Sequence, residues 1–415
     1  MNVELITVGD ELLLGFTVDT NAAYMARELA AIGVAIVRRA SVGDSAPDIA
    51  AAARDALDRT GAVITTGGLG PTADDLTRSA IAELFGRELV PDEARWDALR
   101  ALWKDRGRGE IPLANRTQIM IPAGATVLEN RHGTAPGLWL EDERGRWCAM
   151  LPGVPREMRG MLADELLPRL RSRLGTANRV VRSRMLRTTG LAESRLPEML
   201  GPLAAFEGGL SLAYLPGPEG VDLRLTIRDH DPETADAILD ATMVGLRERI
   251  ARYAYAEDGR DLAAVVLEQC EARGLHIAVA ESCTGGLLGA RLTAIPGSSA
   301  VVHGGVIAYS NDVKQHLLGV SSATLGEYGA VSEEVAREMA AGARRALGAE
   351  IGISITGVAG PGGGTPDKPV GLVWIAVDVN GIARTHGSRF IGDRQEIRLR
   401  ATQAALDLVR RTMAD

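Results

Sequence analysis

Cysteine and long apolar runs are scarce in this chain. Only three cysteines, Cys148, Cys270 and Cys283, occur among the 415 residues. Their odd number and wide spacing argue against a disulfide framework and against a cysteine-ligated metal site. No apolar run approaches the length of a membrane-spanning helix. We therefore expect a protein of the reducing cytoplasm that has no membrane partner.

An excess of positive charge is also missing. The chain has 46 Lys and Arg against 54 Asp and Glu, a net charge of −8. A protein with this balance lacks the general electrostatic footprint of a nucleic-acid-binding protein, although a local positive pocket can still bind a small phosphate. The first residues lack the basic segment of a signal peptide, so we expect Val3–Val8 to be the first strand.

The most informative run is Glu281-Ser282-Cys283-Thr284-Gly285-Gly286. The apolar segment Leu275–Ala280 before it is typical of a buried strand, and Leu287–Ile295 after it is typical of a helix. Ser282 is therefore expected on a strand-to-helix turn, next to backbone N–H groups that the helix leaves unpaired. Such donors can stabilise an oxyanion or a phosphate.

A base for Ser282 is offered further along the chain. Val301–Tyr309 resembles a strand, and the polar residues after it can cap a helix whose first turn contains Lys314. Burial and the helix dipole both lower the pKa of such a lysine. A neutral Lys314 can take the proton of Ser282, and Tyr309 can orient or relay that proton. This is the pattern of a Ser-Lys amidohydrolase.

Simpler interpretations remain open for the same residues. A serine or threonine before Gly-Gly is often only a helix cap with a tight turn, and a first-turn lysine is often a solvated surface charge. Cys283 is a rival nucleophile, although a cysteine directly after a strand is usually a small buried apolar residue.

The carboxyl-terminal third resembles a known enzyme domain. The matching runs are Ala280–Gly286, Pro296–Ser299, Tyr309–Asn311 with Lys314, Gly329–Ser332, Ile355–Pro361, Lys368–Gly371 and Gly392–Arg394. In this order they are similar to the nicotinamide-nucleotide amidohydrolase domain. The resemblance implies that Ser282 and Lys314, with Tyr309 close by, release ammonia from nicotinamide mononucleotide without a cofactor. It also implies substrate contacts from Thr284, Gly285, Gly286, Thr356, Gly357, Gly360 and Arg394.

The amino-terminal third alternates strands and short helices. The expected strands are Val3–Val8, Val34–Arg38 and Ala62–Thr66, and the expected helices are Thr20–Ile32, Ser45–Arg59 and Thr72–Phe85. This alternation predicts an α/β domain with a parallel sheet, whose ligands collect at the carboxyl ends of the strands. Two glycine-containing loops, Gly9–Gly15 and Thr65–Asp75, follow such ends and favour a phosphate site.

Acidic residues in these loops suggest a metal. Asp10, Asp74 and Asp75 can hold a hard divalent cation such as Mg²⁺. The alternative is that Asp74 and Asp75 only cap the helix that follows them. The residues themselves support a pocket for phosphate and metal, and they do not identify the ligand.

Together with the carboxyl-terminal third, these loops make the whole chain similar to the CinA family. The runs that carry the amino-terminal resemblance are Gly9–Gly15, Asp19–Asn21, Thr66–Asp75, Asn130 with Gly133–Gly137, and Leu151–Met158. It implies a molybdopterin-binding-type domain with ADP-ribose pyrophosphatase activity that depends on Mg²⁺, Mn²⁺ or Co²⁺. The implied metal ligands are Asp10 and Asp75. The implied nucleotide and phosphate contacts are Asp19, Asn21, Thr66, Gly67, Gly68, Gly70 and Asp74.

The middle segment has the pattern of a small α+β module, which resembles the KH-like region of the same family. Gly217-Pro218-Glu219-Gly220 fits the GXXG of RNA-binding KH domains, but it lies in a predicted hairpin turn and carries an acid, so we expect no nucleic-acid partner. The expected domains are residues 1–174, 175–256 and 257–415, in a homodimer. A second class remains open, a molybdopterin- or nucleotide-binding protein of the competence or DNA-damage response without turnover.

Overall fold

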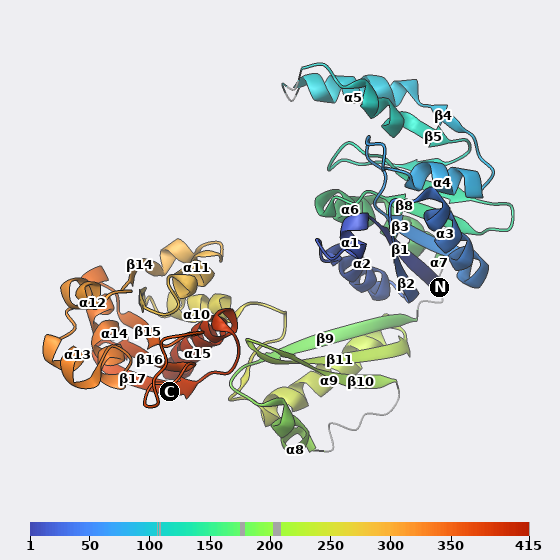
Figure 1. The fold of residues 1–415 in the computed structure, drawn as a ribbon. Helices are drawn as coiled ribbons and strands as arrows, with labels where there is room; N and C mark the ends of the chain where they lie inside the picture. The colour runs from blue at the N-terminus through green and yellow to red at the C-terminus, as the bar shows by residue number, and fades with distance from the viewer. Residues whose placement is uncertain (106, 108, 175–178, 202–208, 415) are drawn as a thin grey trace. The chain divides into compact units, whose positions relative to one another are not determined.

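The computed structural model describes residues 1–105, 107, 109–174, 179–201 and 209–414 (Figure 1). The chain divides into two compact units. The first contains Met1–Arg182 and Ile227–Ala237, and the second contains Ser183–Thr226 and Ile238–Asp415. The domain boundary expected after residue 174 falls on residues 175–178, which lie outside the described residues.

A six-stranded sheet forms the centre of the first unit, with the strand order β2-β1-β3-β8-β7-β6. Neighbouring strands are parallel from β2 to β8 and antiparallel from β8 to β6. Their bounds are β1 (Asn2–Val8), β2 (Ala35–Val42), β3 (Ala62–Thr66), β6 (Thr126–Leu128), β7 (Gly137–Glu141) and β8 (Trp147–Leu151). The chain leaves β1 toward β2 and leaves β3 toward β8, so a topological switch point lies between β1 and β3.

Helices cover both faces of this sheet. Apolar residues of α2, α6 and α7 pack on one face, and those of α3 and α4 pack on the other. The helices are α1 (Asp10–Leu13), α2 (Thr20–Ala31), α3 (Ala46–Thr60), α4 (Thr77–Leu84), α5 (Glu93–Asp105), α6 (Pro155–Met161) and α7 (Leu167–Leu174), with a 3₁₀ segment at Leu113–Ile119 and a π turn at Leu162–Leu166. A separate two-stranded ladder pairs β4 (Leu89–Pro91) with β5 (Met120–Pro122).

One predicted helix is wrong at its start. We expected a helix over Thr72–Phe85, but α4 begins only at Thr77. The Asp75 carboxylate accepts hydrogen bonds from the N–H groups of Gly70, at 2.7 Å, and Thr72, at 2.8 Å. These bonds fold the segment back on itself, so it extends the glycine loop instead of joining the helix.

The connector, residues 180–256, forms the predicted α+β module. Its sheet has the order β10-β11-β9-β12. The elements are β9 (Val180–Thr188), α8 (Leu196–Leu200), β10 (Leu210–Gly217), β11 (Gly220–His230), α9 (Pro232–Arg249) and β12 (Ala254–Ala256), with a 3₁₀ turn at Glu193–Arg195. The turn expected near Pro218 is confirmed, because β10 and β11 meet there.

The carboxyl-terminal part is a second α/β sandwich, with the strand order β14-β13-β15-β16-β17. Its strands are β13 (Ile277–Glu281), β14 (Val302–Ile307), β15 (Ile351–Gly357), β16 (Leu372–Val379) and β17 (Ile382–Arg389). Its helices are α10 (Leu262–Glu271), α11 (Leu287–Thr293), α12 (Asn311–Leu318), α13 (Ser322–Tyr328), α14 (Glu333–Leu347) and α15 (Arg394–Ala414), with a 3₁₀ turn at Ser298–Ala300. Helices α10 and α15 pack on one face of the sheet, and α12 and α14 pack on the other. The predicted α/β class is therefore confirmed.

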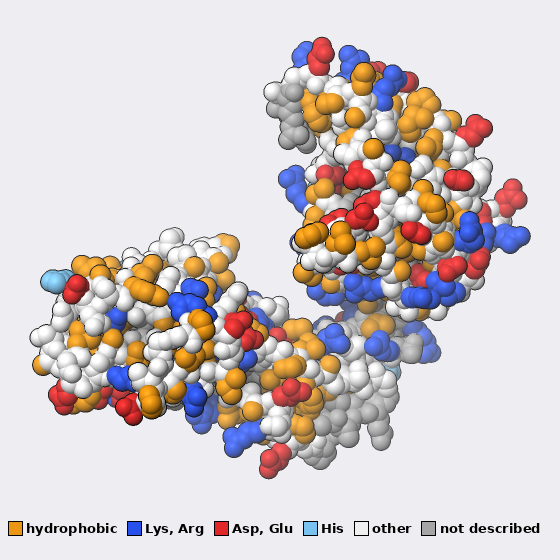
Figure 2. All heavy atoms as spheres, in the orientation of Figure 1, with side chains coloured by type: hydrophobic (Ala, Val, Ile, Leu, Met, Phe, Trp, Pro, Cys, Tyr) orange, Lys and Arg blue, Asp and Glu red, His pale blue; other side chains and the backbone are white. Residues whose placement is uncertain are grey.

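Charges of both signs are interspersed on the visible face of each unit (Figure 2). Among the described residues, no helix is both long enough and apolar enough to cross a membrane.

Candidate active site and amino-terminal cavity

Ser282 lies in the turn between β13 and α11, at the carboxyl end of a strand that has a parallel neighbour on each side. Its N–H donates to the carbonyl of Ile355 at 2.9 Å, and its own carbonyl accepts from the N–H of Gly285 at 3.1 Å. Gly285 and Gly286 have φ values of +60° and +94°, a region that glycine adopts without strain. The turn therefore fixes the backbone of Ser282 from both sides.

Lys314 is brought to Ser282 from 32 residues away. Its Nζ lies 3.1 Å from Oγ of Ser282, and it donates to the carbonyl of Ala308 at 2.7 Å. The side chain is 2% exposed. Burial lowers the pKa of Lys314, against a smaller opposing effect of Cys283. A neutral amine has a lone pair that can accept the serine proton, so the pair has the arrangement of a nucleophile with its base.

Cys283 is a poor rival as nucleophile. Its side chain is buried, and burial raises the pKa of its thiol to about 11. The thiolate is the nucleophilic form of cysteine, and at neutral pH this thiol is almost entirely protonated. Among the two neighbouring side chains, Ser282 is therefore the one with an activating partner.

Glu281 is a residue of this site whose role the sequence pattern did not reveal. Its buried carboxylate accepts from the N–H groups of Gly286 at 3.1 Å, Leu288 at 3.0 Å and Gly289 at 2.7 Å. These are the unpaired donors of the α11 amino terminus. Its position, directly before the serine, was the available signal.

Two of the N–H groups in this turn already have acceptors within the protein. The N–H of Gly285 donates to Ser282 and that of Gly286 donates to Glu281, so neither is free for a ligand. Within the described part of the chain, the N–H groups of Cys283 and Thr284 donate to no other residue. They are the donors left in the turn for a developing negative charge.

Replacing Glu281 by alanine should destabilise the carboxyl-terminal sandwich. Three helix N–H groups would lose their acceptor, and an unsatisfied buried donor costs about 1–3 kcal/mol. We expect a lower melting temperature and faster hydrogen exchange at the amides of residues 286–289. Glu350→Ala is the matched control, because Glu350 accepts from His276 at the other end of β13 and is half-exposed. Equal effects of the two substitutions would contradict this role.

Tyr309 and Arg394 lie together at the edge of the site. The Arg394 guanidinium donates to the Tyr309 hydroxyl at 3.1 Å and to the Gly360 carbonyl at 2.7 Å. Both side chains are exposed. Among the described hydrogen bonds, none joins the Tyr309 hydroxyl to Ser282 or Lys314, so the structure shows no direct proton path from the tyrosine to the pair.

The remaining predicted substrate contacts differ in availability. Thr356 is buried, and its hydroxyl donates to the Ala330 carbonyl at 2.7 Å. A Cβ on Gly357 would lie 2.7 Å from the Leu372 carbonyl oxygen, so this glycine is needed for packing. Thr284 is fully buried; its carbonyl accepts from Arg398 at 2.6 Å, and its hydroxyl has no partner among the described residues. Arg398, which the sequence pattern did not single out, thus holds the nucleophile turn from α15.

The first unit has a cavity of about 400 Å³ at its topological switch point. It is lined by the two loops that follow β1 and β3, together with residues after β8. Among the lining residues are Gly9 and Glu11 from the loop after β1, Asp44 from the segment after β2, and Gly67, Gly68, Gly70, Asp74 and Asp75 from the loop after β3. The predicted phosphate glycines and Asp74 are therefore brought together.

The two predicted metal ligands are used in other ways. Asp75 accepts from Gly70 and from the N–H and hydroxyl of Thr72. Oδ1 of Asp10 accepts from the N–H of Asp44 at 3.2 Å, and the N–H of Asp10 donates to the Asp44 carboxylate at 3.0 Å. Burial, with Asp10, Glu11 and Asp74 nearby, raises the pKa of Asp44. No group of three or more His, Cys, Asp or Glu side chains that could hold a metal ion is found among the described residues.

Three other predicted contacts support the fold around this cavity. Asp19 caps α2 by accepting from the Ala22 N–H at 2.8 Å. Asn21 donates to the Gly153 carbonyl at 2.7 Å, and Thr66 donates to the Pro152 carbonyl at 2.9 Å. Asn21 and Thr66 thus fix the loop after β8, which lines the cavity. The side chains of Asp19, Asn21 and Thr66 are not part of the lining.

Comparison with family models defines the class of this protein. It is a three-domain α/β protein that joins a "Probable molybdopterin binding domain" over residues 4–172, a "Damage-inducible protein CinA KH domain" over 183–256 and a "CinA C-terminal domain" over 259–413. The chain belongs to the CinA family.

Two relatives match the whole chain, whereas a solved structure matches only part of it. A CinA-like protein of Gemmatimonas aurantiaca is 58% identical over 100% of this chain and 97% of that protein. A putative competence-damage inducible protein of Moorella thermoacetica is 44% identical over 100% and 99%. The crystal structure of the competence/damage inducible protein CihA from Agrobacterium tumefaciens is 43% identical and covers 37% of this chain and 94% of that chain, with a TM-score of 0.36.

Proposed function

We propose that this protein hydrolyses the carboxamide of nicotinamide mononucleotide, giving nicotinate mononucleotide and ammonia. The observation that carries the proposal is the pair formed by Ser282 and Lys314, with 3.1 Å between Oγ and Nζ and a lysine that is 2% exposed. A buried lysine with a lowered pKa next to a serine hydroxyl is the chemistry that acyl transfer requires. The choice of a nucleotide as substrate rests on the resemblance of the motifs around this pair to the nicotinamide-nucleotide amidohydrolase domain.

The proposed reaction uses these groups in the following order. Oγ of Ser282 forms a bond to the amide carbon while Nζ of Lys314 takes the hydroxyl proton. The N–H groups of Cys283 and Thr284 donate to the resulting oxyanion. Lys314 then gives the proton to the amide nitrogen, the C–N bond breaks, and ammonia leaves. Water attacks the acyl-enzyme while Lys314 accepts one of its protons. The bond between the acyl carbon and Oγ then breaks, Lys314 returns the proton to Oγ of Ser282, and the acid product leaves and loses its proton to solvent.

The direct test is ammonia release by the purified full chain. Ammonia and nicotinate mononucleotide should appear in equal amounts, at a rate proportional to protein concentration. A folded protein that leaves nicotinamide mononucleotide intact would contradict the proposal.

For the first unit, we propose that the cavity at the switch point binds a phosphate-containing nucleotide such as ADP-ribose. Glycine loops after two parallel strands support this, because backbone N–H groups can approach a phosphate closely there. The residues as arranged do not fit a metal centre, since Asp75 is already bonded to three donors and no three-residue ligand group is present in the described residues. We therefore derive no cleavage step through a metal.

Experiments with ADP-ribose can distinguish binding in this cavity from cleavage of the ligand. We expect saturable binding by calorimetry, and we expect Gly68→Val to abolish it, because a Cβ at Gly68 would lie 2.2 Å from the Thr77 hydroxyl and its φ is +66°. Gly86→Val, at a positive φ with open space around it, is the control for strain alone. Formation of AMP and ribose 5-phosphate on addition of Mg²⁺, Mn²⁺ or Co²⁺ would establish the pyrophosphatase. Binding without products would favour the ligand-binding class.

A further inference from the structure

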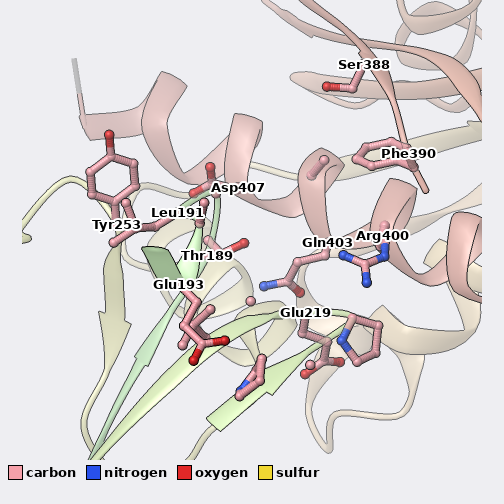
Figure 3. Close-up of a pocket in the computed structure, with 18 of the residues that line it drawn as sticks. Thr189, Leu191, Glu193, Glu219, Tyr253, Ser388, Phe390, Arg400, Gln403 and Asp407 are labelled. Carbon is pink, nitrogen blue, oxygen red and sulfur yellow. The ribbon is translucent and has the colours of Figure 1, made fainter. Parts of the chain in front are cut away.

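The second unit contains a cavity of about 630 Å³ that does not include Ser282. It lies where the connector faces helix α15 and strand β17 (Figure 3). We call it the connector cavity. Its connector side contains Thr189, Leu191, Glu193, Glu219 and Tyr253, and its other side contains Ser388, Phe390, Arg400, Gln403 and Asp407. The volume is that of an ordinary small-molecule site.

Gln403 leaves an unsatisfied donor at this cavity. The side chain is 3% exposed, and its Nε2 has no hydrogen-bond partner among the described residues. Its orientation is fixed, because Oε1 accepts from Arg291 at 2.7 Å. Turning the amide round would place two donors against each other, since a guanidinium cannot accept. The buried N–H₂ therefore requires an acceptor that the described residues do not supply.

The carboxylates of the cavity wall are already compensated. Glu219 pairs with Arg187 at 2.6 Å and with Arg291 at 3.1 Å. Asp407 pairs with Arg410 at 2.7 Å and with Arg411 at 3.0 Å. Glu193, which also lines the cavity, is exposed and has no ion pair with another described residue.

Arg400 adds an uncompensated positive charge. It is half-buried, its Nε is buried without a partner, and no carboxylate of the described residues lies within ion-pair distance. In Figure 3 its guanidinium lies on the same side of the cavity as Gln403, and Phe390 lines the same cavity. A cation and an amide donor next to an aromatic face match an anionic group attached to a planar ring.

We propose that the connector cavity binds an organic anion of nucleotide size that bears a planar ring, as a nucleoside monophosphate does. Anionic oxygens of the ligand accept from Gln403 and Arg400, and the ring packs on Phe390 or Tyr253. No catalytic group of the Ser282 site takes part, so this is a separate binding site.

Helix α15 connects this cavity to the candidate active site. Arg394 and Arg398, in its first turns, contact Gly360, Tyr309 and Thr284. Gln403 lies only nine residues after Arg394, about 13 Å along a helix that rises 1.5 Å per residue. A ligand at Gln403 thus acts on the same rigid element that supports the nucleophile turn. This coupling rests on the proposed amidase function, whereas the binding site itself does not.

Hydrogen exchange with AMP as the probe tests the site on the full chain. AMP should slow exchange in the segments around residues 216–221 and 386–390, and adenosine or inorganic phosphate alone should do so far less. Gln403→Leu should raise the AMP concentration needed for half-maximal protection at least tenfold. If this variant does not fold, Arg400→Met should give the same increase. Gln269→Leu is the control, because Oε1 of Gln269 is also buried without a partner among the described residues, but Gln269 lies outside the cavity.

Several results would overturn the proposal. One is protection by AMP confined to the loop at residues 67–75, which would place the nucleotide in the first unit. Another is full protection by adenosine, which would remove the need for an anion, or by phosphate, which would remove the need for a ring. Protection that persists unchanged in both variants would exclude the assigned residues. None of these readouts depends on ammonia release, so they remain decisive if the amidase proposal fails.

Discussion

Replacing Ser282 by alanine should reduce ammonia release from nicotinamide mononucleotide by at least about 10³-fold, because loss of a covalent nucleophile removes the whole acyl-enzyme route. The turn should keep its shape, since its hydrogen bonds come from the backbone of Ser282 and not from its hydroxyl. The measurement is single-turnover and steady-state ammonia release. Substrate binding, followed by calorimetry, should be nearly unchanged.

Cys283→Ala is the control for this experiment. The Cys283 thiol is buried and its pKa is about 11, so removing it should cost some packing but little activity. Activity that survives in Ser282→Ala and disappears in Cys283→Ala would reverse the assignment of the nucleophile.

Replacing Lys314 by methionine should lower the turnover number by about 10²–10⁴-fold, the usual contribution of a general base. Methionine keeps the buried stem and removes the amine. The pH profile gives the sharper measurement. Burial lowers the pKa of Lys314, and only the neutral amine accepts a proton, so wild-type turnover should rise with pH through that lowered pKa. The residual activity of the variant should lack this rise.

The same pKa shift has a signature in stability. Between the lowered pKa of folded Lys314 and its ordinary value of 10.5, the unfolded chain binds a proton that the folded chain does not. Stability contributed by this group therefore increases as pH rises through that window and is lower below it. The melting temperature of wild type relative to Lys314→Met should rise with pH. A difference independent of pH would mean that Lys314 is not desolvated in the folded protein.

The periodicity of the sequence predicted most of the scaffold. Ala62–Thr66 is a strand with the predicted bounds, and the segment before Ser282 is the strand β13, shifted by two residues at its start. Short apolar runs between glycine-rich turns determine such elements locally. The α/β class followed from their alternation, and the family resemblance supplied the order of the three domains.

What the sequence could not reveal was how side chains use the backbone donors of the turns. The N–H groups of Gly285 and Gly286 appeared free, because a carboxylate at the end of a strand gives no sign that it will fold back onto the next helix. The sequence likewise gave no sign that the Asp75 carboxylate, a predicted metal ligand, accepts hydrogen bonds from Gly70 and Thr72. Arg398 donates to the carbonyl of Thr284, which lies 114 residues earlier in the chain, so no local sequence pattern could predict this hydrogen bond.

The carboxylate of Glu281 also places a negative charge at one side of the candidate site. It occupies the amino terminus of α11, where an anion would otherwise be favoured, so a phosphate group is repelled from the side of the nucleophile. The exposed guanidinium of Arg394 is the cation at the other edge of the site. For the proposed nucleotide substrate, we therefore expect the uncharged amide to face Ser282 and the phosphate to lie toward Arg394.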